Sequence, residues 1–330
     1  MSPRTSPADD GAVLGVDLGG TVVKAALFGP DGTTLATTRR PTGAKRGAEA
    51  VIGTLLDVVS ESQADAEERG TPVRAVGVAS CGIVDERAGV AVFSASFGWR
   101  DVPLRALVAE HAGVPVALGH DVRAGGIAEA RLGAGRGHEV FLFVPIGTGV
   151  GAAVMIGGKP FGGAHWQAGE LGHLIVRPGG ESCGCGQLGC VSTIVGGPAV
   201  LRHYRELAGT GPDGPADAAE VAALARKGDS DAVRVWSEAV DVLAESLAVA
   251  VTLFDPSAIV LGGGLAGAGE LLFTPLRERL AARLAFQVMP ELRHAELAYE
   301  AGCLGAGLLA RDLLARDLPE TGRQAADRTG

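Results

Sequence analysis

Aromatic residues are scarce in this 330-residue chain, at 4% of the sequence. Hydrophobic residues still make up 47%, so the core must be built mainly from valine, leucine and alanine. No apolar run reaches the roughly 18 uncharged residues that a membrane-spanning helix needs. The opening MSPRTSPADDGA also lacks the apolar centre of a secretory signal. We therefore expect a soluble, cytoplasmic protein with no membrane partner.

Positive charge is in short supply as well, and the net charge is −9. This balance argues against affinity for nucleic acid or anionic membranes, so we expect no nucleic-acid partner. At about 100–200 residues per domain, the length favours two domains. We expect disordered tails over 1–12 and 318–330, an N-terminal α/β domain over 13–135, and a C-terminal α/β domain over 136–317. The last helix, about 303–316, could pack back on the N-terminal domain.

A disulfide framework is missing, because five cysteines is an odd number and three of them fall within eight residues. The segment 169-GELGHLIVRPGGESCGCGQLGCVS-192 instead brings together His173, Cys183, Cys185 and Cys190. One imidazole and three thiolates form a complete tetrahedral ligand set for Zn²⁺. Four protein ligands leave no position for water, so the sequence predicts a structural zinc ion. A reduced cysteine loop without metal is the alternative.

The common nucleotide-binding signatures are absent, because the chain has no GxxxxGK[ST] motif and no GxGxxG within one β-α-β unit. Three other glycine turns occur, in 17-DLGGTVVK-24, 145-PIGTGVG-151 and 261-LGGGLAG-267. Glycine allows positive φ and exposes backbone N–H groups to an anion, and the third turn opens a helix whose dipole suits phosphate or ribose. Each turn alone could be an ordinary strand connection, but the three together predict a nucleotide site. The candidate residues are Asp17 (a Mg²⁺ ligand through water), Gly19, Gly20, Thr21, Lys24, Gly147, Thr148, Gly149, Gly263 and Gly264.

The strand and helix patterns repeat along the chain. Three strands are expected within 13–40, and 139–158 repeats the order strand, glycine turn, strand. We therefore expect two similar halves facing a cleft. Further strands are predicted at 75–80, 115–118 and 258–261, and helices at 48–69, 104–112, 122–132, 230–253, 270–284 and 304–314.

A histidine and an aspartate stand side by side in 120-HDVRAGGIAE-129, at the end of a predicted strand. A proton relay, a metal site and a helix cap are all open interpretations. A relay would need both side chains on one face, which neighbours at a strand end rarely achieve. Asp121 occupies a natural N-cap position, and capping is compatible with a catalytic role.

Together, DLGGT, HD at a strand end, PIGTGVGAAV, GELGH and CGCGQLGC resemble the ROK family (repressors, open-reading-frame proteins and kinases) of the actin-like ATPase superfamily, over about Val13 to Leu314. The resemblance implies two actin-like, ribonuclease H-like domains with mixed sheets flanked by helices. It places the active site in the interdomain cleft and a zinc-stapled loop in the second domain. It also implies an ATP- and Mg²⁺-dependent kinase acting on the primary (6-) hydroxyl of a hexose or amino sugar of the glucose or N-acetylglucosamine type. A homodimer, or a tetramer, is the implied assembly.

The same resemblance implies roles for individual residues. Asp121 matches the general base that takes the proton of the sugar hydroxyl. Glu170 matches a residue that bonds sugar hydroxyls, and His173 resembles both a zinc ligand and a neighbour of the sugar. Gly19, Gly20, Thr21, Gly147 and Thr148 match phosphate-binding positions, and Gly263 lies in the segment that flanks the nucleoside.

Three positions depart from the family pattern in the expected sugar pocket. His120 and Ser96 stand where asparagine is usual, and Ser192 stands where glutamate is usual. Altered partners for sugar hydroxyls imply an altered sugar preference. The alternatives are therefore a kinase of another sugar (N-acetylmannosamine, fructose, allose, kanosamine or a cyclitol) and a non-catalytic sugar-binding protein. A DNA-binding regulator is disfavoured, because only twelve residues precede Val13.

Overall fold

The computed structural model describes residues 11–211 and 214–317. These residues form two compact units. The first unit holds the described residues up to Ala128 and from Glu300 onward, and the second unit holds Glu129–Tyr299. Nearly all of the predicted tail 1–12 and the whole of 318–330 lie outside the described residues.

A five-stranded mixed sheet forms the centre of the first unit, in the order β3-β2-β1-β4-β8. Strand β1 pairs antiparallel with β2 and parallel with β4, and β8 pairs parallel with β4. A separate sheet contains β5, β6 and β7. The elements are β1 (Ala12–Leu18), β2 (Val22–Phe28), β3 (Thr34–Pro41), α1 (Ala48–Glu68), β4 (Val73–Ser80), β5 (Ile83–Asp85), β6 (Val90–Ser94), β7 (Trp99–Val102), α2 (Leu104–Ala112), β8 (Val116–His120), α3 (Asp121–Leu132) and α10 (Ala301–Asp317).

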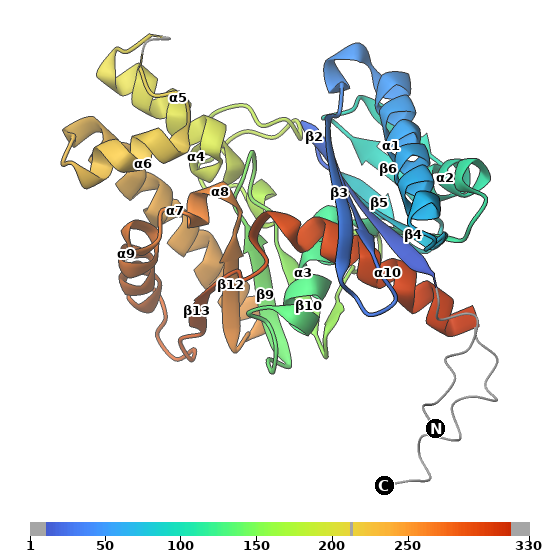
Figure 1. Cartoon of the computed structure of the whole chain (residues 1–330). Coiled ribbons are helices and arrows are strands. Elements are labelled where there is room, and N and C mark those ends of the chain that lie inside the picture. The colour runs from blue at the N-terminus through green and yellow to red at the C-terminus, as the bar shows by residue number, and fades with distance from the viewer. Residues whose placement is uncertain (1–10, 212–213, 318–330) are drawn as a thin grey trace, which may run out of the picture. The chain divides into compact units, whose positions relative to one another are not determined.

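The two faces of this sheet are covered differently. Leu14, Val16 and Leu18 alternate along β1 and pack into one core with side chains of α1 and α2. On the opposite face, helix α10 lies directly on the strands β1, β4 and β8 (Figure 1). Glycine makes this close approach possible, because a Cβ atom on Gly77 would lie 1.8 Å from the backbone oxygen of Ala306.

The second unit repeats the plan of the first. Its sheet has the order β11-β10-β9-β12-β13, with β9 antiparallel to β10 and parallel to β12, and β13 parallel to β12. Helices α5, α6, α7 and α9 contribute with this sheet to the larger hydrophobic core. The elements are β9 (Val140–Pro145), β10 (Ala153–Ile156), β11 (Lys159–Pro160), α4 (Ser192–Val195), α5 (Gly197–Ala208), α6 (Ala218–Arg226), α7 (Ser230–Phe254), β12 (Ala258–Gly262), α8 (Gly263–Ala266), α9 (Glu270–Ala281) and β13 (Glu291–His294), together with short 3-10 helices at Ala44–Arg46, Leu171–His173 and Ala298–Glu300.

The α/β prediction with mixed sheets and flanking helices is confirmed, and the repeat seen in 139–158 extends to all five strands of each sheet. Helices α5 and α6 and the small sheet β5-β6-β7 were not predicted. The helix predicted over 122–132 begins at Asp121. In the part of the chain that the structure describes, no helix is both long enough and apolar enough to span a bilayer.

Candidate functional site

Asp121 lies at the junction of β8 and α3, where a parallel strand of the first sheet ends. Its Oδ1 atom accepts a hydrogen bond from the N–H of Val122 at 2.8 Å. Burial raises the pKa of the Asp121 carboxyl, while the Val122 N–H and the positive charge of Arg123 lower it. Its side chain is still 28% exposed, so the carboxylate reaches solvent and could receive a proton from a ligand.

The expectation that His120 and Asp121 point to different faces is wrong. The Nε2 atom of His120 lies 3.3 Å from Oδ1 of Asp121. The reason is the change from strand to helix between the two residues, which ends the strict alternation of side chains that an extended strand imposes. His120 is therefore placed to contact the carboxylate directly.

A buried ion pair beneath this dyad was not predicted. Nε of Arg123 donates to Oε1 of Glu86 at 2.6 Å, and the backbone N–H of His120 donates to the same oxygen at 3.2 Å. The Arg123 side chain is only 2% exposed. Oε1 of Glu86 thus holds both His120 and Arg123, which flank Asp121. Glu86 lies 34 residues before His120 in the chain.

Strands β1 and β2 carry the pair Asp17 and Lys24 beside the turn that joins them. The two residues face each other across the strands, and Nζ of Lys24 lies 3.0 Å from Oδ2 of Asp17. Burial raises the pKa of Asp17, Lys24 lowers it, and the negative charge of Asp121 raises it further. Lys24 is therefore an ion-pair partner of Asp17.

Thr42 fixes the same turn from outside it. Its Oγ1 donates to the carbonyl oxygen of Gly19 at 2.7 Å, and its backbone N–H donates to that of Thr21 at 2.9 Å. The N–H of Gly19 closes the hairpin onto Val22, so this amide serves the turn itself. Thr42 thus holds the carbonyl groups of both Gly19 and Thr21.

The second unit contains a pocket of about 570 Å³ beside the β9–β10 turn. This size lies in the range of small-molecule sites. Gly147 and Thr148 line it, but the N–H of Gly147 is bonded to the Gly149 carbonyl. One further wall is the third predicted glycine turn, at α8, and the others come from α5, α6, α7 and the 3-10 helix Ala298–Glu300, which the sequence did not place there. Among the lining residues are Gly197, Pro198, Leu201, Asp217, Arg226, Trp236, Gly264 and Tyr299.

Gly263 and Gly264 have different positions at this pocket. Gly264 lines it. Gly263 has φ of 77°, and a Cβ atom there would lie 2.4 Å from the backbone oxygen of Ile146. Gly263 therefore allows α8 to pack against the start of the β9–β10 turn.

The four predicted metal ligands lie together. The ligand atoms of His173, Cys183, Cys185 and Cys190 all lie within 4.8 Å of one another. Nδ1 of His173 is 3.5 Å from Sγ of Cys183, and Sγ of Cys185 is 3.7 Å from Sγ of Cys190. Burial and the neighbouring thiols raise the pKa of Cys190 to about 12. A cation bound at the cluster would favour the thiolate form of Cys190.

The remaining predicted residues lie in separate surroundings. Oε2 of Glu170 is 3.9 Å from Nε2 of His173, on the side of the ring away from Cys183. Ser96 is exposed and faces Gly20, where an added Cβ would lie 3.5 Å from its Oγ. Oγ of Ser192 accepts the N–H of Val150 at 3.1 Å, so Ser192 contacts the β9–β10 turn.

A family model described as the ROK family matches residues 13–313. The chain belongs to the ROK family. It is 36% identical over 309 residues to a glucokinase of Thermotoga maritima, covering 89% of this chain and 95% of the relative. It is 34% identical over 298 residues to an N-acetylmannosamine kinase of Escherichia coli O157:H7, covering 89% and 96%.

A solved ROK structure resembles the whole fold. A ROK family glucokinase from Streptomyces griseus, in complex with glucose and AMPPNP, matches with a TM-score of 0.81 at 32% identity, over 92% of this chain and 100% of that one. The family predicted from the short motifs is thus confirmed, together with the α/β fold of the ROK glucokinases.

Proposed function

We propose that this ROK protein is an ATP-dependent kinase that phosphorylates the primary hydroxyl of a hexose or amino sugar. The observation that carries the proposal is the Asp121 carboxylate, held by the Val122 N–H at the carboxyl end of β8 and still open to solvent. Similarity to glucokinases and to an N-acetylmannosamine kinase supports the same reaction class.

Asp121 acts as the general base. As the sugar oxygen forms its bond to the γ-phosphorus, the hydroxyl proton passes to the carboxylate, and the bond from phosphorus to the bridging oxygen breaks to release ADP. A carboxylate suits this step, because phosphoryl transfer needs mainly positioning and a modest base. The raised pKa of Asp121 makes it a stronger proton acceptor than a fully solvated aspartate.

The nucleotide is held by backbone groups. We assign the pocket beside Gly147 and Thr148 to the nucleoside and its phosphates, and the Thr42-fixed turn Gly19–Thr21 to phosphate contact. Apolar walls with a few polar groups are typical of such pockets. Magnesium, held through water by Asp17, would neutralise phosphate charge. The fit is supported by the buried Asp17 carboxyl, whose pKa is raised by burial and which a cation would stabilise.

The cysteine cluster suits a structural zinc ion. In a tetrahedral site with Zn–S of about 2.3 Å, sulfur atoms lie about 3.8 Å apart and a nitrogen lies about 3.6 Å from a sulfur. The observed 3.7 Å and 3.5 Å agree with those edges. His173 would bind through Nδ1, which leaves Nε2 facing Glu170. Zinc would stabilise the loop that presents Glu170 to the sugar.

His120 and Ser96 leave the identity of the sugar open among hexoses and amino sugars. The imidazole of His120, beside Asp121, is bulkier than an amide and can carry charge. The pattern of sugar hydroxyls that this pocket accepts should therefore differ from that of glucose kinases. A homodimer in the cytoplasm remains our expectation; the exposed Phe286 and Val288, at 86% and 77%, are candidates for a contact between subunits.

The test is ADP release from ATP and Mg²⁺ with glucose, N-acetylglucosamine, N-acetylmannosamine, mannose, fructose, allose, glucosamine and kanosamine. We expect release with one or a few of these sugars and only a background rate without sugar. Sugar binding by calorimetry with no ADP release from any of them would instead support the non-catalytic sugar-binding protein.

A further inference from the structure

The chain segment after the last cysteine of the metal cluster holds the nucleotide turn in place. Ser192 accepts the Val150 N–H at 3.1 Å, and the Gly197 N–H donates to the Gly147 carbonyl at 2.8 Å. A Cβ atom on Gly149 would lie 3.4 Å from Oγ of Ser192. Both ends of the turn Gly147–Val150 are therefore bonded to residues between Ser192 and Gly197.

The same segment begins at a predicted metal ligand. Cys190 is fully buried, and its carbonyl accepts both the N–H of Thr193 at 3.0 Å and the Oγ1 of Thr193 at 2.8 Å. Ser192 lies between these two residues. A displacement of the Cys190 backbone would therefore be passed to Ser192 without a flexible linker.

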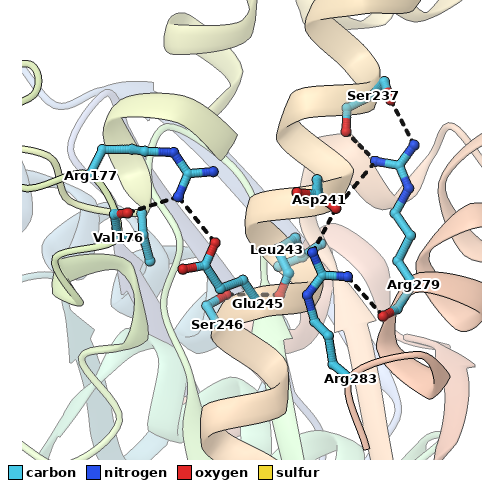
Figure 2. A network of polar contacts seen from close by, with 9 residues as sticks. All are labelled: Val176, Arg177, Ser237, Asp241, Leu243, Glu245, Ser246, Arg279 and Arg283. Carbon is cyan, nitrogen blue, oxygen red and sulfur yellow. Dashed lines mark hydrogen bonds and ion pairs between the residues drawn. The ribbon is translucent and has the colours of Figure 1, made fainter.

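A second connection runs from the metal loop to the wall of the pocket. Glu181, which precedes Cys183, accepts hydrogen bonds from Arg202 and from His203 of α5, the latter at 2.5 Å. Leu201, the neighbouring residue on α5, lines the pocket. The loop is also anchored to α7, where Nη1 of Arg177 donates to Glu245 at 3.1 Å (Figure 2).

We infer that Ser192 is a positioning residue for the nucleotide turn, and that the segment Cys190–Gly197 couples occupancy of the metal site to nucleotide affinity. The inference rests on the proposed function, because it requires a nucleotide in this pocket. Its physical basis is the Val150 N–H: without the Ser192 oxygen, this partly buried donor loses its acceptor, and the turn that carries Gly147 and Thr148 relaxes. The metal site thereby serves the nucleotide as well as the loop of Glu170.

The experiment compares AMPPNP binding, by calorimetry without sugar, in wild type, Ser192→Ala and Ser246→Ala. Ser246 is a matched control, because it is a buried serine of α7 whose Oγ donates to the Leu243 carbonyl (Figure 2). We expect Ser192→Ala to weaken AMPPNP binding about tenfold. Ser246→Ala should leave it within about twofold, because its lost bond joins two residues of α7 and does not involve the turn. Sugar affinity of Ser246→Ala should stay at the wild-type value.

The coupling is tested by repeating the titrations after removal of the metal with a chelator. Metal removal should weaken AMPPNP binding in wild type several-fold, and by a smaller factor in Ser192→Ala, because the connection is already broken. If chelation abolishes the helical circular dichroism signal, the Cys185→Ser variant is used in place of chelation, because Cys185 is an exposed predicted ligand.

The outcomes separate the two proposals. No AMPPNP binding by wild type contradicts the proposed function. Wild-type binding with an unchanged affinity in Ser192→Ala overturns the positioning role, and so does an equal loss in Ser246→Ala. If metal removal weakens AMPPNP binding by the same factor in Ser192→Ala as in wild type, the two changes act independently, and this result overturns the coupling.

Discussion

The two units share one sheet plan but present different chemistry at the end of their first strands. In the first unit β1 pairs antiparallel with β2 and parallel with β4, and in the second unit β9 pairs in the same way with β10 and β12. The first unit has charged groups at this edge of its sheet, Asp17 and Lys24 beside the β1–β2 turn and Asp121 after β8, whereas the second has an apolar pocket beside its glycine turn. A repeated backbone thus fixes where a ligand can be bound, and the residues that follow each strand decide which ligand.

The units also differ in what covers their sheets. Gly15 and Gly77 in the first unit let the backbone of α10 touch the strands. The corresponding first strand of the second unit carries the buried Phe141 and Phe143. Buried aromatic side chains thus fill space beside β9, whereas glycines let α10 approach β1 and β4 closely.

The largest effect is expected at the charged end of the first unit. Asp121→Asn keeps the size of the side chain but removes the base, so kcat should fall about a thousandfold or more. Asp229→Asn is the matched control in the second unit, because Asp229 caps α7 by accepting the Ala232 N–H and lies outside the site. Steady-state turnover with the preferred sugar measures both. Near-normal turnover of Asp121→Asn would show that Asp121 is not the general base.

The close approach of α10 to the glycines of the first sheet is tested by Gly77→Ala. The new methyl group would overlap the Ala306 backbone oxygen, which cannot rotate away, so we expect a loss of about 4 kcal/mol in the free energy of unfolding. Gly53→Ala is the control, since no atom lies within 4 Å of a Cβ atom at this position of α1. Urea unfolding compares them, and equal midpoints would show that α10 does not depend on this contact.

Removal of the metal probes the second unit. Purified protein should contain about one Zn²⁺ per chain. Chelation opens the loop between His173 and Cys190, and we expect a loss of about 3 kcal/mol, similar to that of a cross-link closing a loop of this length. Metal analysis and thermal unfolding test this together. Metal-free protein with an unchanged melting temperature would contradict the stabilising role.

The charged surroundings of Asp121 predict the pH dependence of kcat/KM. Burial raises the pKa of Asp121, and the base must be ionised to accept a proton. Activity should therefore fall with decreasing pH through a pKa above the usual aspartate value of about 3.9. Lys24→Met removes a positive charge that lowers this pKa, so its acid limb should move to higher pH. An acid limb at or below the ordinary value would contradict the burial of the base.

The smallest effect is expected at Thr42. Thr42→Val removes the hydroxyl that holds the Gly19 carbonyl and should raise KM for ATP about threefold. Thr42→Ser retains the hydroxyl and should behave as wild type. Initial rates at varied ATP distinguish the two, and an identical KM in all three proteins would separate Thr42 from nucleotide binding.

Local motifs made part of the site predictable from the sequence. The cysteine cluster, the glycine turns and Asp121 each lie within a few residues of a recognisable pattern, so their positions could be predicted from short segments. The supporting contacts could not, because they join distant positions: Thr42 lies 23 residues from Gly19, and Arg123 lies 37 residues from Glu86. The prediction for His120 and Asp121 was wrong for another reason. Side chains alternate between the two faces only along a strand, and the strand becomes a helix between these residues.

The fold shows the same division. Strong periodicity made the long helices α1 and α7 predictable, whereas β5 and β11, with three and two residues, carry too little pattern to be recognised. The pocket walls from α5 and α6 depend on tertiary packing against α7, which no short segment encodes.

Transfer of phosphate to a primary hydroxyl is best tested by phosphorus NMR of the reaction product. With the sugar that most strongly stimulates ADP release, we expect a phosphate ester coupled to the two protons of the C6 methylene group. An ester on a secondary hydroxyl, or inorganic phosphate with unmodified sugar, would contradict the proposed reaction.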